Sequence, residues 1–198
     1  MPQPAMRRQY AELLRGAAAQ PSLPLVASLH AASLRRAAVP AAALIHAYSA
    51  CGDPAAARSL FDGLPAQDQT LSARTALASA MSAHGRCSEA LALFRGVEGE
   101  MDDRAVTVAL AACARAGLVV EGRALFARVP RPALQHYTCM VEMLGRAGLV
   151  DEAEGLLARV EARPDRVICG VLLAACRVHG RVDVAERVDR LMRKYGIA

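Results

Sequence analysis

The sequence contains no tryptophan and few aromatic residues of any kind. Aromatic residues make up 4% of its 198 residues, whereas apolar residues in total make up 54%. Alanine and leucine supply most of that apolar content, and such side chains allow helices to pack closely. With 22% charged residues, the chain does not have the composition of an intrinsically disordered protein. The composition therefore favours a folded, helical protein.

Long hydrophobic runs are also missing. No uncharged apolar segment approaches the roughly 18 to 20 residues that cross a bilayer. The most apolar stretch, residues 37–50, is too short and contains Pro40 and His46. We therefore expect no membrane-spanning segment. Residues 1–10 resemble neither a secretory signal nor a full transit peptide, so they do not indicate a compartment.

The signatures of the common catalytic and metal sites are absent. There is no Cys-x-x-Cys pair, no phosphate-binding glycine loop and no nucleophile elbow. A zinc deaminase needs His-x-Glu and Pro-Cys-x-x-Cys, and neither occurs. The histidines lack metal-ligand spacing, and His84 and His179, directly before glycines, are predicted to cap helices. We expect no enzymatic activity, no metal and no other cofactor.

The six cysteines favour buried thiols over a disulfide framework. Cys113 and Cys176 occupy the same position, four residues before a glycine, as small buried residues of a helix would. This pattern is typical of a reducing compartment. The net charge of +5, with a pI near 9.1, is compatible with an anionic partner such as nucleic acid, and equally with an ordinary basic protein.

One feature does recur: a glycine returns at steps of 33, 32, 31 and 32 residues. Five residues after each glycine the side chain is small, and nine residues after the first three there is a phenylalanine. A period of this length predicts stacked helical hairpins, a fold that usually provides binding surfaces. The repeating glycines are Gly52, Gly85, Gly117, Gly148 and Gly180.

Each glycine separates two predicted helices. Prolines fall between the helices or in their first turns, as expected if the segmentation is correct. The predicted helices cover 10–19, 25–36, 41–50, 55–64, 72–83, 88–97, 104–116, 119–129, 134–147, 150–162, 166–179 and 182–195, with Ser88 as an N-cap. The phenylalanines that follow the first three glycines by nine residues are predicted to lie in the core; they are Phe61, Phe94 and Phe126.

The predicted fold class is all-α, a right-handed α-solenoid of stacked helix-turn-helix repeats. Its divisions are an N-terminal arm over 1–9, a degenerate first repeat over 10–39, and repeats over 40–70, 71–102, 103–133, 134–165 and 166–198.

The chain resembles the pentatricopeptide repeat family over roughly residues 10–192, and three segments carry this resemblance most clearly. They are Tyr-Ser-Ala-Cys-Gly-Asp at 48–53, Leu-Gly-Arg-Ala-Gly-Leu at 144–149 and Ala-Ala-Cys-Arg-Val-His-Gly at 174–180. The last resembles the extension (E-type) motif of the plant PLS subclass. The resemblance implies an organellar protein, in the mitochondrion or chloroplast, that binds single-stranded RNA at one base per repeat.

The resemblance also assigns the base-reading residues. The first lies ten residues before the turn glycine and the second is the last residue of the repeat. Such a threonine–aspartate pair is associated with guanine, and it supplies hydrogen-bonding groups for a base edge. The threonines could also be ordinary polar residues that face solvent. The candidates are Thr75 with Asp102, Thr138 with Asp165, Thr107, and more weakly Ala42 and Gly170.

Two pairs supply only modest specificity. A good base contact discriminates by about 1–3 kcal/mol, whereas specific recognition needs about 4–10 kcal/mol over non-specific binding. We therefore expect weak or partner-assisted RNA binding in organelle RNA metabolism. RNA editing is the expected setting, with accessory proteins or a deaminase partner supplying catalysis in trans. The alternatives are a tetratricopeptide-like protein-interaction scaffold and a truncated product that has lost its target.

Overall fold

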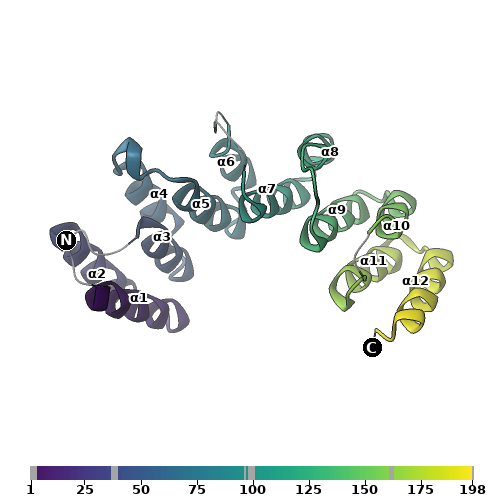
Figure 1. The fold of residues 1–198 in the computed structure, drawn as a ribbon, viewed down its shortest axis with the longest axis horizontal. Helices are drawn as coiled ribbons and strands as arrows, with labels where there is room; N and C mark the ends of the chain where they lie inside the picture. The colour runs from purple at the N-terminus through teal and green to yellow at the C-terminus, as the bar shows by residue number, and fades with distance from the viewer. Residues whose placement is uncertain (1–3, 37–39, 96, 98–100, 161–162, 198) are drawn as a thin grey trace. The chain divides into compact units, whose positions relative to one another are not determined.

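The computed structural model describes residues 4–36, 40–95, 97, 101–160 and 163–197. Within these ranges the secondary structure is helical, apart from turns and loops. The chain forms two compact units, residues 1–99 and 100–198. Figure 1 shows the helices in order along the chain. The fold is an all-helical stacked repeat, as the glycine period predicts.

In the first unit, the first helices of successive repeats pack on one another, α1 on α3 and α3 on α5. The second helices α2, α4 and α6 pack on their own first helices. A short 3-10 helix, η1, occupies the junction at Ala66–Asp68. The helices are α1 (Pro4–Ala19), α2 (Leu23–Arg36), α3 (Ala41–Ala50), α4 (Pro54–Asp62), α5 (Leu71–Ala83) and α6 (Cys87–Ala92).

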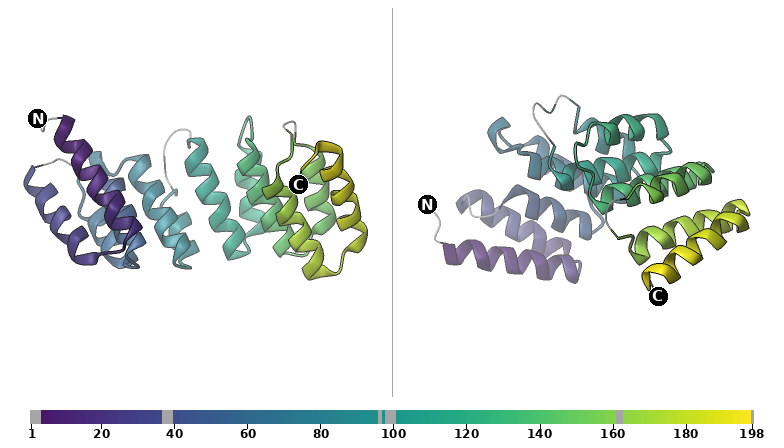
Figure 2. Two further views of the ribbon diagram at one scale, coloured as in Figure 1. Left: turned by 90° about the horizontal axis from the view of Figure 1, so that it is seen from below. Right: turned by 45° about the vertical axis from the view of Figure 1, so that its right-hand side comes forward.

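The second unit repeats this arrangement. The first helices α7, α9 and α11 form a continuous row, and α8, α10 and α12 pack beside them. Both views in Figure 2 show α11 and α12, in light green and yellow, packed against each other. The helices are α7 (Asp103–Ala116), α8 (Val119–Ala127), α9 (Leu134–Arg146), α10 (Val150–Ala158), α11 (Arg166–His179) and α12 (Val182–Tyr195).

The turn glycines explain the hairpins. All five adopt the left-handed conformation, with φ between 67° and 78°. Gly117 caps α7 in this way, and the amide of Leu118 then donates to the carbonyl of Cys113. Residues with a β-carbon rarely adopt this conformation, so glycine at the turn ends one helix and reverses the chain.

Several predicted helix ends need correction. α1 begins at Pro4, inside the segment expected to be an arm. α6 begins at Cys87 after Arg86, so Ser88 lies within the helix and is not its N-cap. α6 and α10 also end earlier than predicted, at Ala92 and Ala158, and the residues that follow directly form turns. The predicted ends of these two helices fall partly on residues outside the described ranges.

The repeats pack through small residues and thiols. Ala57, Ala90 and Ala153, each five residues after a turn glycine, are fully buried. Phe61 is buried, whereas Phe94 and Phe126 are only half-buried. All six cysteines are free thiols, as predicted, and Cys51 and Cys139 are the two that are half-buried. The close packing around Ala57, Ala90 and Ala153 explains why small side chains recur at the repeat period.

Candidate nucleic-acid interface

The predicted base-reading residues share one position on successive first helices. Thr75, Thr107, Thr138 and Gly170 are each the fifth residue of their helix, in α5, α7, α9 and α11. Ala42 is the second residue of α3 and lies outside this register. The shared position places equivalent residues on the same side of each helix in the row.

Two of the threonines bond to their own helix. The hydroxyl of Thr107 donates to the carbonyl of Asp103 at 2.7 Å, and that of Thr138 donates to the carbonyl of Leu134 at 2.9 Å. Both side chains are half-buried. Because the hydroxyl hydrogen is engaged within the helix, the oxygen lone pairs remain to accept a hydrogen bond from a ligand.

Thr75 differs from the other two. It is 2% exposed, and its Oγ1 has no hydrogen-bond partner among the described residues. Burying a hydroxyl without a partner costs stability, so an outside donor or acceptor that reached it would be favoured. Thr75 belongs to the first unit and Asp102 to the second, whereas Thr138 and Asp165 belong to the same unit.

Both candidate aspartates are helix N-caps. Oδ1 of Asp102 accepts from the amide of Ala105 at 2.7 Å, and Oδ1 of Asp165 accepts from the amide of Ile168 at 2.9 Å. The last residue of a repeat therefore begins the next first helix. Each carboxylate keeps its second oxygen for another partner. This capping role was missed from the sequence, although aspartate directly before a helix start signals it.

Neighbouring helices are held in register by bonds between their N-terminal halves. The buried His136 of α9 accepts from the amide of Ala133 at Nδ1, 3.0 Å, so its Nε2 carries the proton. Nε2 therefore donates to the carbonyl of Asp103 in α7, also at 3.0 Å. The thiol of Cys139 lies 3.8 Å from the carbonyl of Thr107. These contacts bring the fifth positions of α7 and α9 onto adjacent helices at the same level.

The thiol of Cys139 is kept in its neutral form. Burial raises its pKa to about 11, and the nearby carboxylate of Glu142 adds to the increase, while Arg115 opposes it. A neutral thiol donates a weak hydrogen bond to a carbonyl without introducing a buried charge. The Cys139 thiol therefore serves the packing of α9 on α7, since a nucleophilic cysteine would need a lowered pKa.

Arginines occupy the far end of the same side. Arg115 is the thirteenth residue of α7 and Arg146 the thirteenth of α9, and both are exposed. Arg146 forms an ion pair with Glu142 at 2.8 Å. Each of these helices therefore carries a threonine near its start and a cation near its end.

The second helices carry ion pairs of their own. Arg123 of α8 pairs with Glu152 of α10, and Arg187 of α12 pairs with Glu154 of α10, both at 2.6 Å. Arg181 pairs with Asp151 at 2.6 Å, and its hydrogen bonds lower the pKa of that carboxyl. Carboxylates on α10 are therefore largely neutralised by arginines of neighbouring repeats.

The described part of the chain holds no group of three or more histidine, cysteine or acidic side chains placed to bind a metal ion. Nor does any helix in those ranges have the length and apolar character needed to cross a membrane.

The family model for the PPR repeat matches residues 42–66, 73–100 and 135–163. The chain is a PPR repeat protein, related to plant PPR proteins. It is 39% identical over 160 residues to pentatricopeptide repeat-containing protein At5g08510 of Arabidopsis thaliana, covering 77% of this chain and 31% of that protein. It is 38% identical over 153 residues to the mitochondrial protein At4g31070 of the same plant, covering 74% of this chain and 24% of that one.

A solved structure of this family shares the fold. PPR10, crystallised in complex with an 18-nt psaJ RNA element, superposes with a TM-score of 0.60 at 25% identity, over 95% of this chain and 29% of PPR10. The chain therefore has the stacked-repeat solenoid fold of PPR10. It spans less than a third of the length of each of these relatives.

Proposed function

We propose that this PPR protein binds single-stranded RNA along the first helices α7 and α9, with Asp165 at the start of α11. The observation that carries the proposal is the register between α7 and α9. The Cys139–Thr107 contact aligns the fifth positions, so Thr107 and Thr138 form successive elements of one surface. The structural neighbour PPR10 was crystallised with an 18-nt psaJ RNA element, which supports RNA as the ligand.

The chemistry of the Thr138–Asp165 pair suits guanine. The hydroxyl of Thr138 already donates to its own helix, and Oδ1 of Asp165 already accepts from a backbone amide. What remains is a hydroxyl lone pair and a carboxylate oxygen, which are both acceptors. Guanine presents two adjacent N–H donors, at N1 and N2, on its Watson–Crick edge. The two acceptor oxygens of Thr138 and Asp165 match these donors, whereas they would repel a base that presents acceptors at the same positions.

The arginines supply the contacts that do not depend on sequence. Arg115 and Arg146 lie two turns beyond the threonines on the same two helices. Guanidinium groups bind phosphates, and a row of them attracts an RNA backbone whatever its bases. Arg146 would exchange its exposed bond to Glu142 for a phosphate contact, which costs little because exposed ion pairs are weak.

The biological setting follows from the relatives. Three of them carry the word mitochondrial in their names. We propose that this chain acts in RNA metabolism of a plant organelle, the mitochondrion or the chloroplast. We further propose that it belongs to the PLS subclass with an E-type motif in its last repeat, and that it supports RNA editing with a deaminase supplied in trans.

Fluorescence anisotropy with short RNAs that differ at one base tests the proposal. We expect binding that weakens as salt rises, and a preference for guanine opposite the repeat of Thr138. Thr138→Ala should reduce that preference about tenfold, since one base contact is worth about 1–3 kcal/mol. Thr107→Ala is the matched comparison. Its repeat ends in Ala133 and lacks an aspartate, so this variant should leave the preference for guanine opposite the repeat of Thr138 unchanged.

Arg115→Gln and Arg146→Gln should weaken binding equally for all bases, and each should reduce the salt slope by about one. Absence of RNA binding even at low salt would overturn the proposed function. An unchanged base preference in Thr138→Ala would overturn the assignment of the base-reading residues.

A further inference from the structure

The last first helix, α11, does not continue the polar side of its neighbours. In α9 the fifth, ninth and thirteenth residues are Thr138, Glu142 and Arg146. In α11 the same positions hold Gly170, Ala174 and Val178. With Val167, one turn earlier, these residues form an apolar strip along the helix, which we call the α11 strip.

The α11 strip is open to solvent. Val167 is 60% exposed and Val178 is 73% exposed, and Gly170 and Ala174 between them are also exposed. The strip runs over three turns of helix, or about 16 Å at the usual rise per residue. A contiguous exposed apolar surface with a polar rim is typical of a protein-interaction site.

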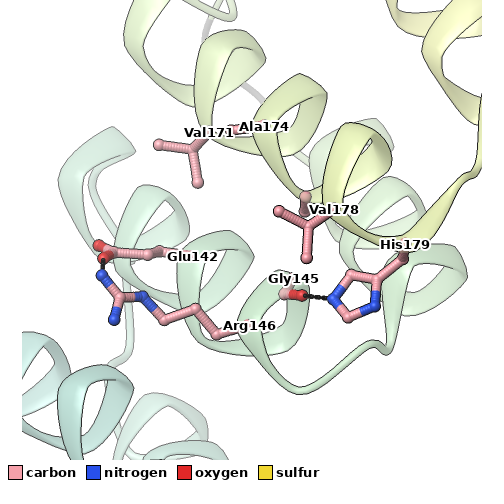
Figure 3. A pocket seen from close by; sticks show the side chains of 8 residues that line it. Glu142, Gly145, Arg146, Val171, Ala174, Val178 and His179 are labelled. Atoms are coloured by element: carbon pink, nitrogen blue, oxygen red, sulfur yellow. Dashed lines mark hydrogen bonds and ion pairs between the residues drawn. The ribbon is translucent and has the colours of Figure 1, made fainter.

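A groove between α9 and α11 adjoins the strip. Its volume is about 370 Å³, and Val171, Ala174 and Val178 form its α11 wall. Figure 3 shows these side chains facing Glu142 and Arg146 of α9, with the His179–Gly145 hydrogen bond closing one end. The two valines of this wall project into the space between the helices. The groove can therefore receive an aliphatic side chain.

The charges around the strip are mainly positive. Arg166 and Arg177 are exposed and make no ion pair or hydrogen bond within the described part of the chain. They lie eleven residues apart, so they project from the same flank of α11. On the opposite side the groove carries Arg146, and its partner Glu142 is the one carboxylate among the described residues that line the groove. An occupant with acidic groups at its edges would match this arrangement.

We propose that the α11 strip and its groove bind an amphipathic helix of a partner protein, with an aliphatic face and acidic flanks. Such a helix presents apolar side chains at i, i+3, i+4 and i+7, which fit an elongated groove of this length. Its carboxylates would meet Arg166 and Arg177 along one flank of the strip. The inference does not depend on RNA binding by the other helices.

RNA is a poorer match for this surface. Proteins that hold single strands stack bases on aromatic rings or recognise them with hydrogen bonds. The α11 strip has no aromatic ring and no side-chain donor or acceptor. Its valines and alanine offer only aliphatic contact, which a helix with leucine or isoleucine side chains satisfies better.

The test is selection from a displayed library of helical peptides. Leucines are fixed along one face, and the flanking positions are randomised among glutamate, lysine, glutamine and alanine. We expect peptides rich in glutamate to be enriched on the protein. They should bind the double variant Val167→Asp/Val178→Asp at least tenfold more weakly, as measured by fluorescence anisotropy.

Two control variants sharpen the result. Val120→Asp replaces a valine that is 76% exposed on α8, away from the groove, and should leave peptide binding unchanged. Arg177→Glu should shift the enriched peptides from glutamate toward lysine on one flank. Circular dichroism of each variant confirms that the helices are retained.

Several outcomes would overturn the proposal. They are the absence of enrichment relative to the double variant, enriched peptides that bind both proteins equally, and enrichment without glutamate. A dimer of the wild type that dissociates in the double variant would identify a second copy as the occupant instead. Loss of RNA binding in the double variant, without peptide binding to the wild type, would identify the strip as an RNA surface.

Discussion

His179 at the end of α11 lies with its Nε2 2.9 Å from the carbonyl oxygen of Gly145 in α9. A carbonyl can only accept, so Nε2 carries the proton and donates. His84 makes the equivalent contact in the first unit, 3.2 Å from the carbonyl of Ser49 in α3. These histidines cap carbonyls of the preceding repeat, so they join repeats to one another as well as ending their own helices.

Replacing His179 with alanine should therefore weaken the packing of α11 on α9. A hydrogen bond of this kind contributes about 0.5–1.5 kcal/mol, and urea unfolding should show a loss of that size. Arg190→Ala is the control, because Arg190 is exposed and has no partner among the described residues. If both variants unfold at the same urea concentration as the wild type, the histidine does not stabilise the repeat contact.

The helices α9 and α11 lie close together at Gly145. A β-carbon added there would lie 2.7 Å from the β-carbon of Ala175, which is too close for two methyl groups. Gly145→Ala should destabilise the protein by about 1–3 kcal/mol through overpacking, in spite of a gain in helix propensity of up to about 1 kcal/mol. Thermal unfolding measures the difference.

Two further variants test this explanation. Ala175→Gly should restore part of the stability lost in Gly145→Ala, as a double-mutant cycle would reveal. Gly155→Ala, in α10, places its new methyl where no side chain or backbone outside its own stretch of helix lies within 4 Å, and it should be neutral or stabilising. Equal losses in Gly145→Ala and Gly155→Ala would point to a backbone effect and contradict the packing argument.

The ion pairs of Arg181 predict how stability depends on pH. Hydrogen bonds from Arg181 lower the pKa of both Asp151 and Asp183. A carboxyl whose pKa is lower in the folded state stabilises the fold above its unfolded pKa, about 3.9, and loses this effect as the pH falls through the folded value. Arg181→Gln should therefore lower the melting temperature at neutral pH and matter progressively less as the solution is acidified below about pH 4. A melting difference that is the same at pH 7 and in strong acid would contradict this account.

The hairpin segmentation could be predicted from sequence because each turn depends on one residue type. Glycine at Gly52 or Gly180 is required by a positive φ, so the period of the glycines is the period of the fold. The burial of Thr75 could not be predicted in this way. It shares its register with Thr138, which is half-buried, yet Thr75 is 2% exposed. The repeat register gives a residue's position along its helix but does not give how tightly neighbouring side chains cover it.

The contacts between α9 and α11 could likewise be predicted only in part. A spacing of about 34 residues places His179 one repeat after Gly145, but only the packed structure shows which carbonyl the ring meets. The change from polar to apolar residues at Val178 was visible in the sequence. Its significance depends on knowing that Arg146 and Val178 occupy equivalent positions on adjacent helices.

Asp165 offers a way to separate folding from base recognition. Its carboxylate caps α11, and serine is as good an N-cap as aspartate, whereas alanine loses about 0.5–2 kcal/mol. Asp165→Ser should therefore keep the stability of the wild type, and Asp165→Ala should not, as measured by urea unfolding. Both variants should lose preference for guanine, because neither retains a carboxylate at that position.

Asp53 provides the matched control for these variants. It caps the second helix α4 through the amide of Ala56 at 2.8 Å, and it is not a candidate base-reading residue. Asp53→Ala should reduce stability by the same amount as Asp165→Ala while leaving the base preference intact. Should Asp165→Ser retain full discrimination for guanine, the carboxylate would be a helix cap only, and base recognition in this repeat would have to come from another residue.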